Sequence, residues 1–514
     1  MEIENRIEKK IILRQLRMIW GSQVPNNILY FFIKVYNESI RKGKIFVNEI
    51  KNIKLEFMRV MEDRVKMHEL IEDYLIPHDI EKRINAEIST PFALRTEMIE
   101  SMDQKRLGFN FWSGQYVRND DLSWNFVLPK IFEPCCGKGG FLMSLIDKLM
   151  IELESEIQDE KERYRKIVEE CLYFADINPL NIFICKVLLG KGDINKYKFN
   201  VYTGDTLNTV TNIILNFFKV NRFDLIIGNP PYSTDPSQPD TKTLYNLFIE
   251  KYIDTTDYLL FVVPSKWFSA GKGLDKFRHF MLSRKDILFI KHVQESKKWF
   301  SNVVIKGGVN YFLKVPYETE CDFNNQKIIL NKYDILLEPD YRALIDKICH
   351  HPSIDTIHMS RSYYSIETND KRLHDVKQID DIDCYVSVKK SIDRKKFINK
   401  KYCSKNPTWK VITPEANGKE KSGFGYMTII EPENVYSNSY IGFEVKNKEA
   451  GENLISYLKC KLPNTLLNTR KITQHINAFT LKWIPLVPLN KKWNDKEVYE
   501  YFGLMEQEIK LIER

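Results

Sequence analysis

The sequence lacks three features that would each define a class of protein. It has no run of roughly 18 apolar residues, so we predict no membrane-spanning helix and no membrane partner. It has nine cysteines in 514 residues without CxxC spacing, which argues against a disulfide scaffold or structural zinc. Its first residues, MEIENRIEKK, are too charged for a signal peptide. We therefore expect an intracellular, cytoplasmic protein without a metal site.

The chain does contain enough apolar material for a large core. Hydrophobic residues make up 43% and charged residues 28% of the chain, a balance that excludes wholesale disorder. A length of 514 residues predicts roughly two to four domains. Lys and Arg exceed Asp and Glu by 77 − 69 = 8. This mild excess is compatible with an acidic partner but does not identify one.

Short apolar runs alternate with helical patterns from about residue 127 to residue 314. The runs FDLIIG and YLLFVV have the length and composition of buried strands, whereas FLMSLIDKLM has helical spacing. This alternation predicts an α/β fold with a doubly wound, Rossmann-like, mostly parallel sheet. Ligands of such sheets bind at the carboxyl ends of the strands.

The segments on either side differ from this core. Residues 1–84 carry apolar residues at near-helical spacing, which favours an amphipathic helical segment; a basic DNA-contacting arm is the alternative. After residue 320 short strands mix with helices, and VYEYFGLMEQEIKLIER predicts a single terminal helix. We expect three parts: a helical segment 1–84, the α/β core 85–320 and a mixed α+β domain 321–514.

A glycine-rich loop follows the first strand of the core. The segment FEPCCGKGGF places Gly137 and Gly139 between a strand and a helix, where they allow a tight turn and the close approach of a ligand. The spacing matches neither the phosphate-binding pattern GxxxxGK nor the dinucleotide pattern GxGxxG. By itself the loop is also compatible with a purely structural turn.

Carboxylates end the next two predicted strands. Asp176, at the end of LYFAD, is suited to accept hydrogen bonds from both hydroxyls of a ribose. Asp205, in the segment TGD, is suited to accept from the exocyclic amine of an adenine. Asp is also common in helix caps and turns, so both residues have a structural interpretation as well.

The tetrapeptide Asn229-Pro230-Pro231-Tyr232 after the fourth strand is the most specific pattern in the chain. An exocyclic amine on an aromatic ring is a weak nucleophile because its lone pair is delocalised. The side-chain oxygen of Asn229 and the following carbonyl can accept both N–H groups, and the prolines stiffen the loop. Tyr232 offers a face for stacking of a flat base. The structural alternative is a Pro-Pro turn beside a surface tyrosine.

Together these motifs resemble the S-adenosylmethionine-dependent amino-group methyltransferases. The closest resemblance is to the gamma-class DNA adenine-N6 methyltransferases of restriction-modification systems, in the same order along residues 86–314. The family more often has Asp at the position of Glu133 and a small residue near Cys135. The resemblance implies a site-specific enzyme that methylates N6 of a flipped-out adenine in double-stranded DNA.

The resemblance also implies roles for individual residues. The segment around Thr90 would cover the methionine part of the cofactor, and Phe300 would lie beside the flipped base opposite Tyr232. The implied catalytic residues are Asn229, Pro230, Pro231, Tyr232 and Phe300. The implied binding residues for S-adenosyl-L-methionine are Thr90, Pro91, Glu133, Cys135, Gly137, Gly139, Phe141, Asp176, Ile177, Asp205, Thr206, Asn229 and Phe248.

The excess of positive charge lies in one stretch of the C-terminal third. Residues 387–410 carry nine Lys and Arg against one Asp, so 9 − 1 = 8 and the rest of the chain balances to zero. Aromatic residues are interleaved, as in surfaces that contact phosphates and bases. A solvated loop with ordinary surface lysines is the alternative. We predict DNA contacts by Lys389, Lys390, Arg394, Lys395, Lys396, Lys400, Lys401 and Trp409.

Three other functions share parts of these patterns. The NPPY motif also occurs in methyltransferases that act on protein glutamine or on RNA, but those are usually shorter and lack a large domain after the core. A fused nuclease would need a paired-acid site, and the residues before the core contain no convincing set. A silent binding protein would not need Asn229, Asp176 and Gly137 together. A separate cognate restriction nuclease stays open as a partner.

Overall fold

The computed structural model describes residues 88–234, 242–269, 273–300, 307–389, 391–403, 405–416, 423–471 and 474–513, with the single residues Arg14, His68 and Ile305. Apart from Arg14 and His68, the predicted helical segment 1–84 lies outside the described residues, as does Lys390. The chain forms two compact units. Unit 1 contains Met1–Ser265 and Lys285–Lys327, and unit 2 contains Lys266–Arg284 and Ile328–Arg514. The boundaries at residues 84 and 320 stay predictions.

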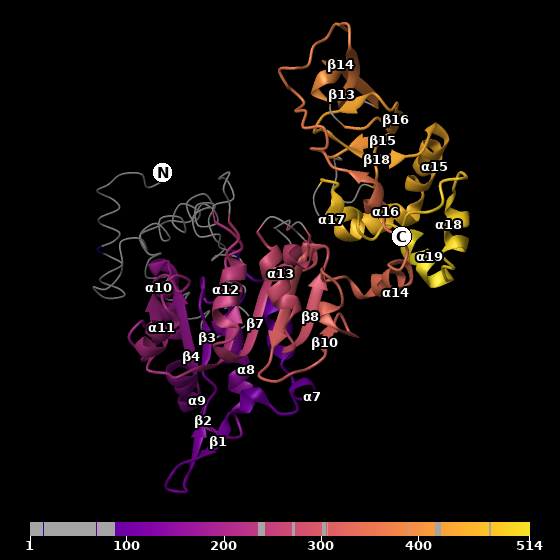
Figure 1. The fold of residues 1–514 in the computed structure, drawn as a ribbon. Coiled ribbons are helices and arrows are strands. Elements are labelled where there is room, and N and C mark those ends of the chain that lie inside the picture. The colour runs from indigo at the N-terminus through magenta and orange to yellow at the C-terminus, as the bar shows by residue number, and fades with distance from the viewer. Residues whose placement is uncertain are drawn as a thin grey trace, which may run out of the picture. The chain divides into compact units, whose positions relative to one another are not determined.

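Unit 1 is built on a nine-stranded sheet with the order β11-β10-β8-β9-β7-β6-β3-β4-β5 (Figure 1). The strands from β5 to β7 pair in parallel, as do β8 and β10, whereas β9 runs antiparallel to β7 and β8. The predicted α/β fold with a mostly parallel sheet is therefore confirmed. The strands are β3 (Ile131–Glu133), β4 (Leu172–Asp176), β5 (Asn200–Thr203), β6 (Phe223–Gly228), β7 (Thr256–Pro264), β8 (Ile287–Val293), β9 (Val309–Lys314), β10 (Cys321–Phe323) and β11 (Gln326–Ile328).

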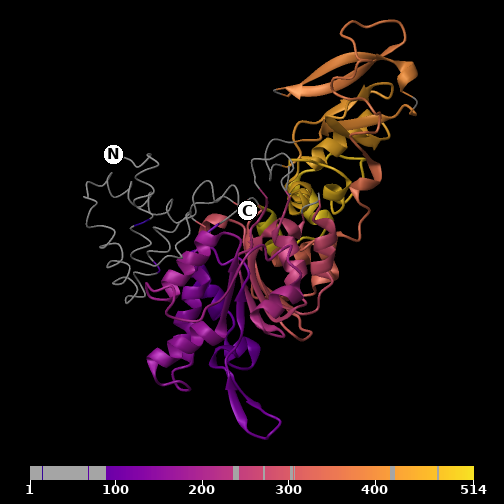
Figure 2. The same ribbon diagram turned by 90° about the vertical axis from the view of Figure 1, so that its left-hand side faces the viewer.

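The helices of unit 1 cover both faces of this sheet (Figure 2). They are α6 (Phe92–Glu100), α7 (Gln104–Leu107), α8 (Gly140–Glu152), α9 (Glu160–Lys166), α10 (Pro179–Leu189), α11 (Thr211–Phe218) and α12 (Tyr245–Tyr252). A separate hairpin consists of β1 (Gln115–Arg118) and β2 (Trp124–Val127). Among the described residues, no helix is long and apolar enough to cross a membrane.

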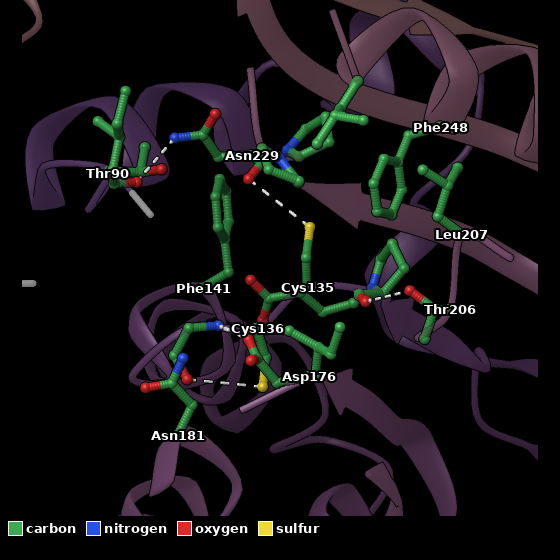
Figure 3. Close-up of a pocket in the computed structure, with 18 of the residues that line it drawn as sticks. Thr90, Cys135, Cys136, Phe141, Asp176, Asn181, Thr206, Leu207, Asn229 and Phe248 are labelled. Atoms are coloured by element: carbon green, nitrogen blue, oxygen red, sulfur yellow. Dashed lines mark hydrogen bonds between the residues drawn. The ribbon is translucent and has the colours of Figure 1, made fainter. Parts of the chain in front are cut away.

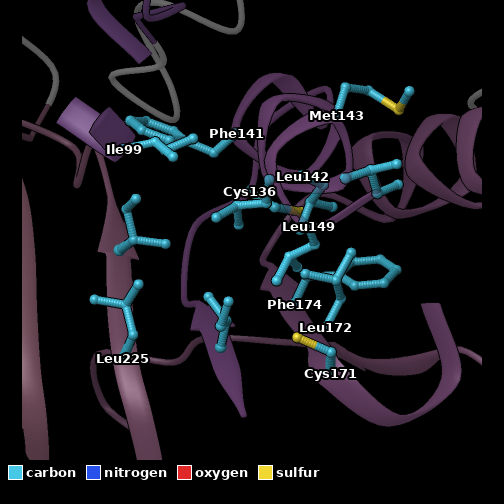
Figure 4. Packing of buried hydrophobic residues seen from close by; sticks show 14 of the residues in the cluster. Ile99, Cys136, Phe141, Leu142, Met143, Leu149, Cys171, Leu172, Phe174 and Leu225 are labelled. Carbon is cyan, nitrogen blue, oxygen red and sulfur yellow. The ribbon is translucent and has the colours of Figure 1, made fainter. Parts of the chain in front are cut away.

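Successive side chains of each strand point to opposite faces of the sheet, which gives one apolar layer on each face. Ile131 and Leu172 point to one face, where they join a buried cluster with side chains of α6, α8 and α10 (Figure 4). Phe132 and Tyr173 point to the other face, where both rings contact Phe218 of α11 at centroid distances of 5.7 and 5.4 Å. Burial on both faces is why these strands read as continuous apolar runs.

The order of the strands determines where a ligand binds. From β3 the chain continues to β4 and β5 on one side, and then returns to β6 and β7 on the other. The direction of winding therefore reverses between β3 and β6, and such a reversal opens a crevice at the carboxyl ends of the strands. The glycine-rich loop, Asp176, Asp205 and Asn229 all follow strands at this edge.

Unit 2 is a mixed α+β body with two small sheets, in agreement with the predicted C-terminal architecture. The sheet orders are β12-β18-β15-β16 and β14-β13-β17. The strands are β12 (His358–Met359), β13 (Asp381–Lys389), β14 (Ile392–Asn399), β15 (Trp409–Pro414), β16 (Thr428–Ile430), β17 (Val435–Tyr436) and β18 (Tyr440–Val445). The helices are α13 (Asp275–Leu282), α14 (Pro339–Ile348), α15 (Lys448–Leu458), α16 (Lys461–Arg470), α17 (Ala478–Leu481), α18 (Asp495–Tyr501) and α19 (Glu506–Glu513).

The prediction of one terminal helix is wrong, because α18 and α19 are separate. Gly503 has φ of 59°, a left-handed conformation that ends a helix and that glycine adopts without strain. The next helix then begins with the Met505 N–H donating to the Glu508 carboxylate at 2.7 Å. Gly503 in the sequence was the available signal for this break.

Candidate active site

A cavity of about 380 Å³ lies at the carboxyl ends of β3, β4, β5 and β6 (Figure 3). Its walls come from residues 88–90, 95, 133–138, 140, 141, 176, 177, 181, 204–208, 229–231, 233 and 234, together with Leu244 and Phe248. These segments are far apart in the sequence, and the winding of the sheet brings them together. The cavity therefore occupies the position that the fold favours for a ligand.

Most of the predicted site residues line this cavity. They are Thr90, Glu133, Cys135, Gly137, Phe141, Asp176, Ile177, Asp205, Thr206, Phe248, Asn229, Pro230 and Pro231. Pro91 and Gly139 are not among the lining residues, and instead directly precede α6 and α8. Gly139 has φ of 85°, and a Cβ there would approach Cys185 Sγ to 3.1 Å, so the loop requires glycine at this position.

Glu133 ends β3 with a buried carboxyl group. The residue is 2% exposed, and its Oε2 accepts no hydrogen bond within the described part of the chain. Burial raises the pKa of Glu133 well above its usual range, with Arg95 opposing the shift and Asp176 adding to it. A buried, unsatisfied carboxyl oxygen on a cavity wall is suited to a cationic ligand group such as an ammonium.

Asp176 connects the end of β4 to the glycine-rich loop. Its Oδ2 accepts from the Gly137 N–H at 2.9 Å, and its Oδ1 accepts from the Asn178 N–H at 2.8 Å. These bonds give Asp176 the structural role that the sequence left open. A carboxylate offers about four acceptor sites, so Asp176 is also a suitable acceptor for the hydroxyls of a bound ribose.

Asp205 organises the turn that follows β5. Its Oδ1 accepts from the N–H groups of Leu207 and Asn208 at 2.9 and 3.0 Å, and its Oδ2 accepts from the Asn208 amide at 2.6 Å. Partial burial raises the pKa of Asp205, but the hydrogen bonds from Asn208 and Leu207 outweigh it and lower the pKa. Thr206 Oγ1 donates to the Pro134 carbonyl at 2.7 Å and joins this turn to the glycine-rich loop.

Asn229 is oriented by the segment that precedes α6. Its Nδ2 donates to the carbonyl oxygen of Ile88 at 3.0 Å, while its Oδ1 is buried and accepts no hydrogen bond from any described residue. The thiol of Cys135 donates to the Asn229 main-chain carbonyl at 3.6 Å (Figure 3). The unsatisfied Oδ1 is an acceptor available to an N–H group of a ligand in the cavity.

Tyr232 and Phe300 are the predicted catalytic residues that the structure does not bring to the cavity. Neither is among its lining residues. Burial raises the pKa of the Tyr232 hydroxyl and the neighbouring Asn229 side chain opposes this shift, while Phe300 is 2% exposed within the core of unit 1. Their proposed contact with a flipped base stays a prediction.

Several lining residues were missed by the sequence analysis, and Arg95 is the most notable. It is 1% exposed; its guanidinium donates through Nε to Ser144 Oγ at 3.1 Å and through Nη1 to the Thr90 carbonyl. A Cβ at Gly140 would come within 2.9 Å of the Nη1 atom, so glycine there makes room for the arginine. An isolated arginine on a helix carries no sequence signal for such a position.

Within the described ranges, no three His, Cys, Asp or Glu side chains cluster as a metal site.

The basic stretch forms the hairpin of β13 and β14 in unit 2. Lys389, Arg394 and Lys401 are exposed and make no ion pair within the described part of unit 2. Three further cations, Lys395, Lys396 and Lys400, are partly neutralised by acids outside the basic stretch. The N–O distances are 3.7 Å for Lys395 with Asp383, 3.2 Å for Lys396 with Asp375 and 3.0 Å for Lys400 with Glu433.

The end of the basic stretch belongs to the core of unit 2. Trp409 opens β15 and packs against the buried cluster of that unit. Lys410 is fully buried, and its Nζ donates to the carbonyls of Pro432 and Asn434 at 3.0 and 2.7 Å. Burial lowers the pKa of Lys410 to about 8. Lys410 therefore contributes to the net charge of the chain but not to the surface of the hairpin.

Comparison with known proteins supports a methyltransferase core. Residues 170–300 match the family model described as Eco57I restriction-modification methylase. A segment of 143 residues is 31% identical to an uncharacterized adenine-specific methylase of Mycoplasma pneumoniae, covering 26% of this chain and 34% of the relative. The chain thus spans about a third of the length of this curated relative. Both matches support the resemblance to restriction-modification methyltransferases, while the gamma class stays a prediction.

Two of the solved structures to which the chain is similar are restriction-modification enzymes. A nuclease-deletion mutant of the Type ISP restriction-modification enzyme LlaGI, in complex with a DNA substrate mimic, is 12% identical, with 97% of this chain and 64% of that chain covered and a TM-score of 0.48. The Type IIL restriction-modification enzyme MmeI, in complex with DNA, is 11% identical, with 79% and 66% covered and a TM-score of 0.44.

Proposed function

We propose that this protein is an S-adenosylmethionine-dependent DNA methyltransferase that modifies the N6 amine of adenine at specific sites. The observation that carries the proposal is the buried Oδ1 of Asn229, which accepts no hydrogen bond from the described part of the chain and lies in one cavity with Glu133, Asp176 and Asp205. Leaving a buried acceptor without a partner costs about 1–3 kcal/mol. An acceptor kept in this state on a cavity wall is best explained by a ligand that donates to it.

The donor set of the cavity fits S-adenosylmethionine. Glu133 suits the ammonium of the methionine part, Asp176 suits the ribose hydroxyls and Asp205 suits the adenine amine. Phe248, in the middle of α12, adds an apolar side chain. When bound, this cofactor supplies an electrophilic methyl group on a sulfonium sulfur.

Asn229 acts on the amine that receives the methyl group. Its Oδ1 and the following backbone carbonyl hold the two amine protons, which localises the lone pair on the nitrogen and directs it into the cavity. The bond from Asn229 Nδ2 to Ile88 fixes the carboxamide so that Oδ1, rather than Nδ2, faces the amine. Pro230 and Pro231 restrict the backbone that carries these acceptors. The methyl group passes directly to the amine without a covalent enzyme intermediate. Orientation of the two reactants therefore supplies most of the rate enhancement.

Unit 2 supplies the contacts to DNA in this proposal. The β13–β14 hairpin carries exposed cations at Lys389, Arg394 and Lys401, which suit phosphate contacts. A two-stranded ribbon of this kind fits the major groove of a duplex. The target adenine must leave the duplex to reach Asn229, at a cost of a few kcal/mol.

Incubation with double-stranded DNA and methyl-labelled S-adenosylmethionine tests the proposal. Sequencing that detects N6-methyladenine should place the label on adenine within a defined sequence, and an Asn229→Ala protein prepared in parallel should give none. Label on cytosine, on RNA or on protein glutamine would instead assign the cavity to another amine. The adenine-specific relative is the observation that favours adenine over those substrates.

A further inference from the structure

The turn at residues 205–209 is held from outside the cavity by the last residues of α12. The ammonium of Lys251 donates to the carbonyls of Thr206 at 2.6 Å and Leu207 at 2.9 Å, and also to the carbonyl of Thr209. The hydroxyl of Tyr252 donates to the same Thr206 carbonyl at 2.9 Å. Four hydrogen bonds from α12 are therefore accepted by three main-chain carbonyls of one short turn, those of residues 206, 207 and 209.

The hydrogen bonding of the Lys251 ammonium is unusual for a lysine on a helix. An ammonium has three N–H donors, and each of them is used here on a main-chain carbonyl. The side chain is half-buried; burial lowers the pKa of Lys251, while the charge of Asp205 acts against this shift. A surface lysine normally extends its ammonium into water, so the ordered arrangement indicates a specific role.

The same helix and the same turn both line the cavity. Phe248 lies one helical turn before Lys251 and contributes to the wall, as do Asp205, Thr206, Leu207 and Asn208 of the turn. Within the turn, the Asp205 carboxylate already accepts from Leu207 and Asn208. The position of this carboxylate in the cavity therefore depends on the path of residues 206–209, which α12 sets.

We propose that Lys251 and Tyr252 are positioning residues that fix the 205–209 turn so that Asp205 recognises the exocyclic amine of the cofactor's adenine. The inference rests on the proposed function, since it assumes that the cavity binds S-adenosylmethionine. It goes beyond that function by assigning specificity for the nucleobase of the cofactor to two residues outside the cavity wall.

Calorimetric titration with two cofactors tests this role. The first is S-adenosylmethionine, and the second is its analogue with hydrogen in place of the 6-amino group of adenine. The wild-type protein should bind S-adenosylmethionine about tenfold more tightly than the analogue, because one buried hydrogen bond distinguishes them. Lys251→Met should bind S-adenosylmethionine about tenfold less tightly and the analogue almost unchanged, so the preference disappears. Lys251→Arg, which keeps N–H donors, should retain most of the preference.

The exposed Lys161 of α9 provides the matched control, since Lys161→Met removes a charge in the same unit without touching the turn. Equal affinity of Lys251→Met and the wild-type protein for S-adenosylmethionine would overturn the inference. An equal loss for both cofactors, with the preference intact, would overturn it as well, because Lys251 would then act on the fold alone. If Lys251→Met does not fold, Tyr252→Phe decides: it should lower the preference about threefold, and an unchanged preference would refute the role. A wild-type protein that binds neither cofactor would refute the proposed function itself.

Discussion

The cavity of unit 1 and the basic hairpin of unit 2 differ in how their polar groups are satisfied. In the cavity, Glu133 Oε2 and Asn229 Oδ1 are buried and accept no hydrogen bond from the described residues, which is costly unless a ligand completes them. On the hairpin, Lys395, Lys396 and Lys400 are near the surface and already face acids. An exposed lysine costs the fold almost nothing, so its presence says less about a ligand than an unsatisfied buried acceptor does.

Asn229→Ala gives the largest expected effect and separates chemistry from binding in the cavity. Without the Oδ1 acceptor the amine lone pair stays delocalised, so the rate of methyl transfer should fall by at least about a hundredfold. The dissociation constant for S-adenosylmethionine should change by less than about threefold. Single-turnover methylation and calorimetry measure the two quantities. Exposed Asn195 offers a control, since Asn195→Ala should alter neither. Wild-type transfer by the Asn229 variant would contradict the mechanism.

Asp176→Ala should weaken cofactor binding by about tenfold to a hundredfold. The variant loses the acceptor for the ribose hydroxyls and also the bond that holds the Gly137 N–H at 2.9 Å. Calorimetric titration measures the change in dissociation constant, and the melting temperature without cofactor monitors the loop itself. A dissociation constant equal to that of the wild-type protein would remove Asp176 from the binding site.

Glu133 predicts a pH dependence of cofactor binding with a definite sign. Its raised pKa keeps the buried carboxyl neutral at low pH, and ionisation on raising the pH supplies the negative charge that attracts the cofactor's ammonium. Affinity for S-adenosylmethionine should therefore increase with pH, by up to about tenfold per pH unit, below about pH 7 where the ammonium stays charged. Titrations across this range measure the slope. Glu133→Gln should remove the slope, and the same slope in that variant would exclude Glu133 as its origin.

The same group acts in the opposite direction on the cofactor-free protein. Because the folded state binds the Glu133 proton more tightly than the unfolded state, the free energy of unfolding should fall as pH rises from the usual carboxyl value of 4.5 towards the raised pKa. Denaturant unfolding at several pH values measures this contribution as the difference between wild-type protein and Glu133→Gln. A wild-type protein that gains stability relative to Glu133→Gln as the pH rises would contradict the burial of an uncharged carboxyl.

The hairpin should show the smallest effects, and they should differ between paired and unpaired cations. Arg394→Ala should lower DNA affinity severalfold and reduce the slope of log affinity against log salt by about 0.9, as expected for one phosphate contact. Lys396→Ala should do less, because its ammonium already faces Asp375 at 3.2 Å. Binding titrations at several salt concentrations measure both. If the salt dependence of DNA affinity has the same slope for Arg394→Ala and wild type, Arg394 does not contact a phosphate.

The sequence was most informative where a short motif follows a strand. Asn229, Asp176 and Asp205 could be placed in one site because parallel strands bring their carboxyl ends to one edge of a sheet. The lining role of Arg95 could not be predicted, since it depends on the packing of α6 beside Gly140. Lys251 escaped notice for a similar reason: its acceptors are main-chain carbonyls more than forty residues earlier, which no residue pattern encodes.

Charge density was a weaker guide than the strand-end motifs. The excess of positive charge lies in residues 387–410, but in the folded protein those cations occupy different environments. Lys410 is buried among carbonyls, Trp409 packs against a core, and Lys395 lies near Asp383. The pairing acids lie in other segments, so a count within one window cannot reveal the neutralisation. Phe300 was selected from a motif, and its ring lies in the buried core of unit 1, so its contact with a flipped base stays a prediction.

The path of the chain between the two units limits how they can be exchanged between relatives. The chain crosses between them three times, after Ser265, after Arg284 and after Lys327, because α13 belongs to unit 2 although it lies between β7 and β8 in the sequence. Arg278 of this helix donates to the Asp334 carbonyl at 3.0 Å. A graft that replaces only the residues after 320 would keep the original α13 and pack it against a unit 2 of different sequence. An exchange of unit 2 for that of another protein would therefore require two grafted segments, 266–284 and 328–514, transplanted together.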